Sequence, residues 1–193
     1  NCKEYIERSF AKIDKDKKSF VIGNAGRLVE QKGQKYLIDL AVELKKRKSE
    51  FKILIAGSGE LEKELKEYAV SMDVQEKIVF TGFKENIKDL MENIDVFILT
   101  SKWEGFGYVL AEAMLSKKPV IAFNVSSNSE LIDNGKNGYL IEPFDIEKMA
   151  DMVEQLMGDL EVQKQFGEYG LKKAVEQFEI ERVYREVKKI ISM

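Results

Sequence analysis

Two hydrophobic patterns alternate along the chain from about residue 20 onward. Short apolar runs without polar alternation predict buried strands. These runs are Phe20–Ile22, Phe51–Ala56, Lys77–Phe80, Asp95–Leu99, Pro119–Phe123 and Tyr139–Ile141. Strands of this kind that alternate with helices are typical of a parallel sheet covered on both faces. The pattern therefore predicts an α/β fold, a doubly wound Rossmann-like parallel sheet of about six strands with helices on both faces.

The stretches between the strands have the apolar spacing of amphipathic helices. They run near Gly33–Lys48, from Gly57 to about Ser71, near Glu85–Asn93, from the loop Gly105–Gly107 to about Ser116, over Ile146–Gly158 and over Leu160–Gln177. Ser127 and Glu130 have the spacing of a capping box before Leu131. A last amphipathic stretch, Ile180–Ile191, predicts a helix that serves as packing surface or lies at a domain interface. C-terminal helices are thus expected beside the sheet.

Composition limits the organisation and function of the chain. Its 193 residues suffice for one large domain, which we expect over residues 19–193, with the charged residues 1–18 as a linker remnant or an N-terminal extension. The balance of 31 basic and 34 acidic residues gives no electrostatic reason to expect nucleic acid as a partner. Histidine is absent, which excludes a Ser-His-Asp triad and histidine metal sites within this chain.

Cysteine usage and hydropathy bear on the cellular compartment. The single cysteine, Cys2, argues against disulfides and against a zinc site, and it favours a reducing compartment. No apolar run approaches the roughly 20 residues of a membrane span. The first residues are charged and lack the apolar core of a signal peptide. We therefore expect a cytoplasmic location.

Two carboxylates on either side of a glycine loop are the strongest candidates for chemistry. Glu104 precedes Gly105-Phe106-Gly107, and Glu112 follows in the predicted helix. The loop comes after a predicted strand, where doubly wound sheets bind ligands, and its glycines and helix-start amides suit an anion. Apolar residues surround Glu112 in the sequence, so we expect it to be buried and to have a partner or a task. The alternatives are an exposed loop acid at Glu104 and a core-paired carboxylate at Glu112.

Two cations and a second glycine pair give weaker signals. Arg27 follows the first strand, and Lys32 is expected at the start of the next helix, where a cation opposes the helix dipole. An anion bound between them would remove that conflict, although spacing alone favours two solvated surface charges. Gly57-Ser58-Gly59 is similar to a fragment of a dinucleotide loop, but Glu62 stands where the third glycine belongs. A tight turn with Ser58 as helix N-cap is the favoured interpretation.

Taken together, these segments resemble the C-terminal, nucleotide-sugar-binding domain of the group 1 retaining glycosyltransferases, which have the two-domain GT-B fold. The matching segments are Gly26-Arg27-Leu28 with Lys32-Gly33, Ile55–Gly59, Phe80–Phe83, Ser101–Glu112, Pro119–Ala122, Glu130–Ile132 and Asn137–Ile141. The two glutamates with seven residues between them and Gly-Phe-Gly inside are the most specific element. The resemblance covers about residues 20–190.

The resemblance implies roles for these residues. Arg27 and Lys32 would hold the donor diphosphate and stabilise its charge as the glycosidic bond breaks, Glu104 would bind hydroxyls of the donor sugar, and Glu112 would bind the ribose. Donor contacts are also implied for Gly26, Gly57, Thr81, Gly82, Phe83, Gly105, Phe106, Gly107, Tyr108 and Val109, with the base near Thr81–Phe83. Members of this family are metal-independent, need no cofactor and retain the anomeric configuration, so the same is expected here.

The chain departs from the family in two ways. The loop Asn124–Asn128 lacks the glycine pair of many relatives, which leaves its donor contacts open. The N-terminal acceptor domain is expected to be absent, so the chain would be the donor-binding half of an enzyme that transfers a hexose from a UDP-sugar to a saccharide or glycolipid. The isolated domain would then transfer poorly, and any membrane association, at the inner face of the membrane, would depend on the missing half.

Other functions fit the sequence less well. A non-catalytic nucleotide-sugar-binding module and a nucleotide-sugar epimerase of the same fold remain alternatives to the transferase. A phosphorylase would need a cofactor-binding lysine motif that the sequence lacks. An NAD-binding domain is disfavoured by the incomplete glycine fingerprint at Gly57.

Overall fold

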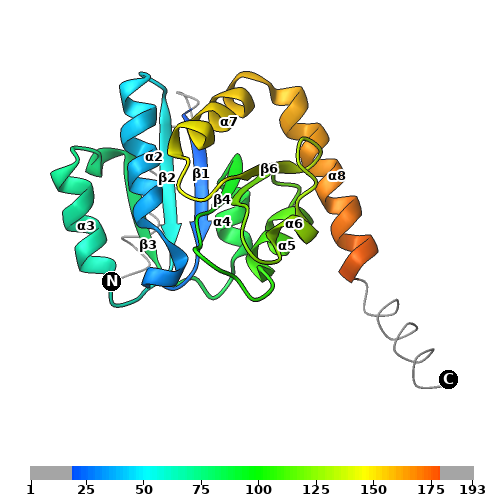
Figure 1. The fold of residues 1–193 in the computed structure, drawn as a ribbon, viewed down its shortest axis with the longest axis horizontal. Coiled ribbons are helices and arrows are strands. Elements are labelled where there is room, and N and C mark those ends of the chain that lie inside the picture. The colour runs from blue at the N-terminus through cyan, green and yellow to red at the C-terminus, as the bar shows by residue number, and fades with distance from the viewer. Residues whose placement is uncertain (1–18, 179–193) are drawn as a thin grey trace.

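The computed structural model describes residues 19–178, which form an α/β domain around one parallel sheet (Figure 1). The strands are β1 (Phe20–Ala25), β2 (Phe51–Ala56), β3 (Ile78–Gly82), β4 (Val96–Leu99), β5 (Val120–Phe123) and β6 (Gly138–Ile141), in the order β3-β2-β1-β4-β5-β6. All neighbouring strands are parallel. The predicted six-stranded doubly wound sheet is therefore confirmed. Residues 1–18 and the helix expected over Ile180–Ile191 lie outside the described residues.

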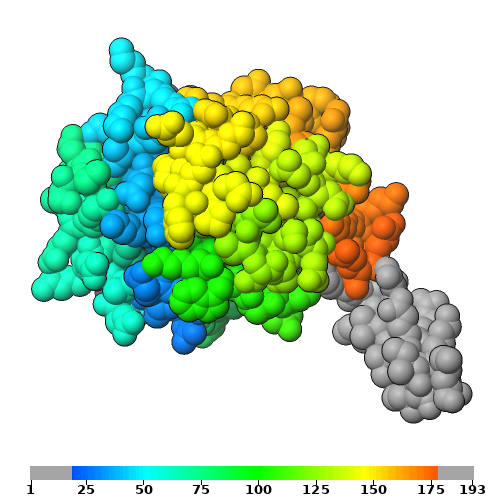
Figure 2. Space-filling view, in the orientation of Figure 1, coloured from blue at the N-terminus to red at the C-terminus, as the bar shows by residue number. Residues whose placement is uncertain are grey.

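Helices cover the sheet on both faces. They are α2 (Lys35–Lys46), α3 (Glu62–Ser71), α4 (Lys88–Glu92), α5 (Tyr108–Leu115), α6 (Asn128–Leu131), α7 (Ile146–Gly158) and α8 (Leu160–Phe178), with 3-10 turns η1 (Glu30–Lys32) and η2 (Gln75–Lys77). One apolar cluster joins α2, α3 and α7 to the sheet, and a second joins α4 and α5 to the opposite face. In the space-filling view α7 (yellow) lies against α2 (light blue) on the face toward the viewer (Figure 2).

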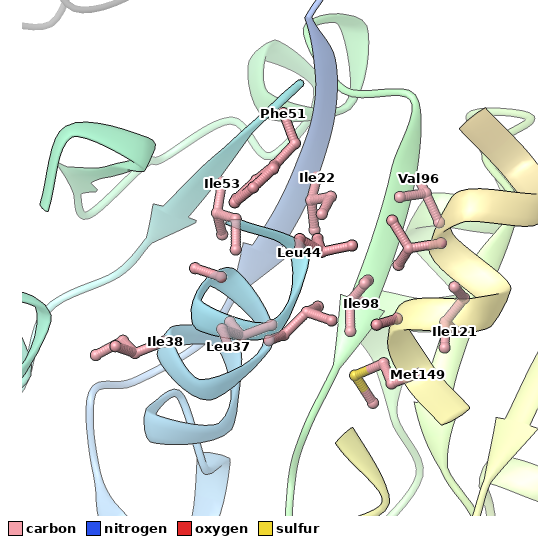
Figure 3. Close-up of a cluster of buried hydrophobic side chains, with 14 of the residues drawn as sticks. Ile22, Leu37, Ile38, Leu44, Phe51, Ile53, Val96, Ile98, Ile121 and Met149 are labelled. Atoms are coloured by element: carbon pink, nitrogen blue, oxygen red, sulfur yellow. The ribbon is translucent and has the colours of Figure 1, made fainter. Parts of the chain in front are cut away.

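Alternate residues of each strand point to opposite faces, and both sets are buried. Ile22, Ile98 and Ile121 pack beneath α2 and α7, together with Leu37 and Met149 from those helices (Figure 3). Their neighbours Val21, Phe97 and Val120 belong to the cluster on the other face. Complete burial of an Ile or Leu side chain contributes roughly 1.5–3 kcal/mol. This two-sided burial explains why the strands lack polar alternation.

The structure corrects one predicted helix start and one predicted side-chain cap. Helix α3 begins at Glu62 rather than at Gly57, and Ser58 does not cap it, because the Ser58 carbonyl instead accepts a hydrogen bond from the Leu28 N–H at 3.0 Å. Ser127 precedes α6 but makes no side-chain cap, because its hydroxyl donates to the Gly105 carbonyl at 3.1 Å. Both serines link loops at the carboxyl edge of the sheet. Capping rules that consider only nearby residues therefore failed at both serines, because each serine bonds to a residue far away in the sequence.

Strand β1 continues three residues beyond its predicted end at Ile22. Gly23 and Asn24 weaken the strand pattern in the sequence, yet both are buried within the sheet. The position of a Gly23 Cβ is occupied by the Ile94 side chain, and the Asn24 amide donates to the Ile98 carbonyl at 2.8 Å. Tertiary neighbours thus account for both residues. Within the described part of the chain, no helix is long and apolar enough to cross a membrane.

Candidate functional site

The loops that follow β1 and β4 meet at the carboxyl edge of the sheet, and an ion pair joins them. Lys32 Nζ lies 2.7 Å and 2.9 Å from the two carboxylate oxygens of Glu104, which is 72 positions away in the sequence. The Glu104 side chain is 7% exposed and that of Lys32 is 19% exposed. The Ser101 hydroxyl donates to Glu104 Oε1 at 2.5 Å. Glu104 is therefore a partly buried carboxylate with a partner at each oxygen, and not an exposed loop acid.

Backbone contacts hold the same two loops together. The Gln31 side-chain amide donates to the Trp103 carbonyl at 3.0 Å, and the Lys102 N–H donates to the Gln31 carbonyl at 2.8 Å. The ammonium of Lys102 also pairs with Glu30. Strands β1 and β4 are neighbours where the strand order reverses, which is the position at which doubly wound sheets bind ligands. The ion pair is thus fixed at the expected binding edge.

The environment of Lys32 differs from the one that the sequence predicts. Lys32 ends the 3-10 turn η1, and α2 begins only at Lys35, so the ammonium does not stand at the start of that helix. The negative charge beside it in this structure is the Glu104 carboxylate. Lys32 is therefore neither in conflict with a helix dipole nor a solvated surface charge. Gly26 lies against the aliphatic stem of Lys32, whose Cδ is 3.5 Å from the position of a Gly26 Cβ.

Arg27 places an exposed guanidinium on a hydrogen-bonded backbone segment of the loop that also carries Lys32. Its backbone is held on both sides, because the Gly26 N–H donates to the Ala56 carbonyl at 3.0 Å and the Gln34 amide donates to the Arg27 carbonyl at 3.0 Å. Arg27 is exposed, and no residue between 19 and 178 is seen to pair with its guanidinium. A guanidinium presents a planar fork of donors that matches phosphate oxygens. The geometry suits an anion at this edge.

The predicted contacts after β2 and β3 lie on neighbouring loops. The Gly57 N–H donates to the Gly82 carbonyl at 2.8 Å, which ties the two loops together. Thr81 is buried, whereas Phe83 is 70% exposed. An exposed aromatic ring on a fixed loop can pack against a planar group. Of these residues, Phe83 has the side chain most open to a ligand.

The glycine loop leads into α5 as predicted. Gly107 precedes the helix in a left-handed conformation, with φ of 72°. Tyr108 is 76% exposed, and its ring centroid lies 4.9 Å from that of Phe106. Val109 is partly buried and packs on the apolar cluster beneath α5. The loop therefore presents its backbone and an aromatic pair at the same edge as Lys32.

The expected burial of Glu112 is wrong. Glu112 is exposed on α5, because its apolar neighbours Leu110 and Ala113 point to the sheet while Glu112 points away from it. It lines an open groove between α4 and α5 together with Ile87 and Met91. Partial burial in this groove removes part of the carboxylate hydration and raises the pKa of Glu112. No described residue pairs with its carboxylate, so the core-paired alternative is also wrong.

Replacing Glu112 by glutamine is expected to raise the melting temperature at pH 7 and to have little effect near pH 4. An acid whose pKa is raised on folding binds more protons in the folded chain, so its charged form lowers stability above the ordinary carboxyl pKa and stops doing so below it. Thermal unfolding at the two pH values measures the difference. Glu60→Gln, at an exposed loop position, is the control. A lower melting temperature for Glu112→Gln at pH 7 would contradict the prediction.

Some residues of the site were not singled out for a role in the sequence. Ser101 holds the Glu104 carboxylate, and its only sequence signal is a serine three positions before an acid that follows a strand. Asn24 and Gln34 are buried beside the loop after β1, and each has a side-chain oxygen with no partner among the described residues. The only feature of the sequence that could have indicated a role for Asn24 is its position, as an asparagine, inside an apolar run. Within residues 19–178, no three side chains of Cys, Asp or Glu gather as metal ligands.

Comparisons with known proteins find relatives and solved structures that are similar over most of this chain. The kanosaminyltransferase of Streptomyces kanamyceticus is 30% identical over 173 residues, which are 84% of this chain and 44% of the relative. A crystal structure of S. aureus TarM with fondaparinux, alpha-GlcNAc-glycerol and UDP has a TM-score of 0.86 and 27% identity, covering 91% of this chain and 36% of that one. The chain spans about half the length, or less, of the curated relatives that it matches.

A second similar structure has about the same length as this chain. It is the C-terminal domain of a glycosyl transferase group 1 family protein, LpcC, from Francisella tularensis, with a TM-score of 0.72 and 28% identity. The similarity covers 82% of this chain and 85% of that domain. The family model for glycosyl transferases group 1 matches residues 6–173. With most of its length matched, the chain belongs to the group 1 family of glycosyl transferases.

Proposed function

We propose that this chain is the donor-binding part of a retaining glycosyltransferase that transfers a hexose from a UDP-sugar. The observation that carries the proposal is the Lys32–Glu104 pair beside the open guanidinium of Arg27, at the strand-order reversal of the sheet. The UDP present in the TarM structure supports a uridine nucleotide as the ligand. The LpcC C-terminal domain supports the assignment to the donor-binding part.

Arg27 and Lys32 would act on the diphosphate. A lysine ammonium has three donors, and Glu104 receives two close contacts from it, so one N–H direction is left for a phosphate oxygen. As the bond between the sugar and the diphosphate breaks, negative charge grows on the leaving group. Two cations at this edge would stabilise that charge in the transition state, and they would take the place of a metal ion.

The remaining donor contacts would follow the edge of the sheet. The backbone of Gly105–Gly107 and the Glu104 carboxylate would meet the sugar, and Glu112 would accept hydrogen bonds from the ribose hydroxyls in the groove beside α4. Phe83, on the loop after β3, would pack against the base. The acceptor attacks on the same face from which the diphosphate departs, so the anomeric configuration is retained. No cofactor beyond the nucleotide sugar takes part.

The acceptor would be a saccharide or a glycolipid, bound by a second domain of the whole enzyme. The kanosaminyltransferase and TarM are both more than twice as long as the part that this chain covers, which supports such a division. We place the reaction in the cytoplasm, with any contact to the inner face of a membrane made by the second domain.

Arg27→Ala is expected to weaken UDP binding roughly 10- to 100-fold, because one charge-assisted contact to the diphosphate is lost. Calorimetric titration of UDP, GDP, UDP-glucose and UDP-GlcNAc into the chain measures this and identifies base and sugar together. Lys63→Ala, which removes an exposed charge from α3, is the control. If wild type and Arg27→Ala bind UDP equally, the phosphate assignment is wrong. If the wild type binds none of the four, the proposed function fails.

A further inference from the structure

The loop Asn124–Asn128, which lacks the glycine pair of many relatives, contacts the backbone of the glycine loop through two serines. The backbone N–H of Glu104 donates to Ser126 Oγ at 3.2 Å. The hydroxyl of Ser127 donates to the Gly105 carbonyl at 3.1 Å. Both contacts join segments 22 positions apart in the sequence. We refer to Ser126 and Ser127 as the serine pair.

The serine pair fixes the direction of two peptide planes. The plane between Trp103 and Glu104 is held at both ends, because Ser126 accepts from its N–H and the Gln31 amide donates to its carbonyl at 3.0 Å. In a trans peptide the carbonyl and the N–H point in opposite directions. The bond from Ser127 to the Gly105 carbonyl therefore also sets the direction of the Phe106 N–H.

The space around Gly105 itself is open. Around the position that a Gly105 Cβ would occupy, no heavy atom of the described chain beyond the adjoining residues lies within 4 Å. Glycine also rotates more freely than any other residue. Without Ser127, the peptide between Gly105 and Phe106 would lose the hydrogen bond that sets its direction.

Ser126 has a backbone conformation that glycine adopts more easily. Its φ is 50°, in the left-handed region, where glycine is unstrained and serine is not. Glycine would fit the turn better but could not accept the hydrogen bond from the Glu104 N–H. The contribution of serine at this position is thus the oxygen atom.

We propose that Ser126 and Ser127 are positioning residues that hold the Glu104–Phe106 backbone in the geometry that recognises the donor sugar. The inference rests on the proposed function, since it assigns the sugar to this loop. It does not place either serine in contact with the reacting atoms. Arg27 and Lys32 would hold the diphosphate. Loss of the serine pair should therefore weaken the binding of the sugar moiety and leave the binding of the nucleotide moiety unchanged.

Three variants test the proposal in the full chain. Ser126→Gly removes the hydroxyl and the backbone strain, Ser126→Ala removes the hydroxyl only, and Ser127→Ala removes the second contact. In all three we expect the dissociation constant of the preferred UDP-sugar to rise about fivefold, as for one lost hydrogen bond, with that of UDP unchanged. The melting temperature should hold or rise in Ser126→Gly and fall in Ser126→Ala. Ser129→Ala, at an exposed position in α6, is the control.

Amide hydrogen exchange separates this inference from the proposed function. In Ser126→Gly the Glu104 amide should exchange about fivefold faster than in wild type, with or without nucleotide. Unchanged exchange would show that the serine pair does not hold the loop. If the Glu104 amide exchanges faster but the affinities for UDP and for the UDP-sugar fall equally, the selective effect on the sugar is refuted. If wild type binds no nucleotide, the proposed function fails, and with it the assignment of the loop to a sugar.

Discussion

Replacing Lys32 by methionine is expected to lower the free energy of unfolding by about 2–3 kcal/mol and to weaken UDP binding by at least about tenfold. The loss of stability arises because the Glu104 carboxylate is left unpaired with only 7% of its side chain exposed. Breaking a fully buried pair costs about 3–5 kcal/mol, and the partial exposure of Lys32 reduces that amount. Methionine preserves the length of the aliphatic stem that packs on Gly26.

A double-mutant cycle separates the two effects of Lys32. Glu104→Gln removes the carboxylate, and Lys32→Met combined with Glu104→Gln removes both charges. The double variant should be more stable than Lys32→Met alone, because no unpaired charge is left. It should still bind UDP weakly, because the ammonium that would hold the diphosphate is absent. Urea unfolding and UDP titration of all four proteins complete the measurement.

The cycle has outcomes that contradict this account. If the double variant is no more stable than Lys32→Met, the pair does not stabilise the fold as the geometry indicates. If the double variant binds UDP as tightly as wild type, Lys32 serves only to neutralise Glu104, and Arg27 alone would contact the phosphates. Lys63→Met, at an exposed position in α3, is the matched control for removal of a surface ammonium.

Replacing Gly57 by alanine is expected to lower the free energy of unfolding by at least about 3 kcal/mol. The φ of Gly57 is 142°, a conformation that L side chains rarely adopt, and a Cβ at this position would lie 1.9 Å from the Gly26 carbonyl oxygen. That oxygen belongs to the backbone and cannot move aside without disturbing the loop that carries Arg27. For a domain of this size the melting temperature should fall by roughly 6–12 °C.

Gly158→Ala is the matched control for Gly57→Ala. Gly158 is the last residue of α7, and no heavy atom of the described chain beyond the adjoining residues and its own helix backbone lies within 4 Å of the position of its Cβ. Alanine there should leave stability unchanged or raise it by up to about 1 kcal/mol. Equal melting temperatures for Gly57→Ala and Gly158→Ala would mean that the loops after β1 and β2 are not packed as described. The fold thus accounts for Gly57 without any contact to a donor.

The hydrophobic pattern predicted the architecture because its causes are local. Strand β2 and helix α7 have the bounds that the pattern predicts, since both faces of β2 and one face of α7 are apolar in the sequence. The predicted element boundaries were wrong where a contact with a residue far away in the sequence determined the boundary. Helix α3 begins five residues late because the backbone at Ser58 bonds to Leu28 instead of starting a helix.

The candidate site could be predicted only in part. The sequence placed Arg27, Lys32 and Glu104 at strand ends, and a parallel sheet brings such ends to one edge. It did not show that Lys32 and Glu104 pair with each other, because 72 positions separate them. The neighbours of Glu112 in the sequence suggested burial, yet helix geometry turns Glu112 away from the face on which Leu110 and Ala113 are buried.

The sequence by itself determined the fold class, the order of the elements and the residues that carry charge at the binding edge. These follow from hydrophobic periodicity and from residue chemistry, which need only near neighbours. The tertiary structure alone decided that Glu104 neutralises Lys32, that Arg27 stays open and that Ser126 and Ser127 hold the glycine loop. Such contacts join loops that only the closed sheet brings together, and no local pattern encodes their geometry.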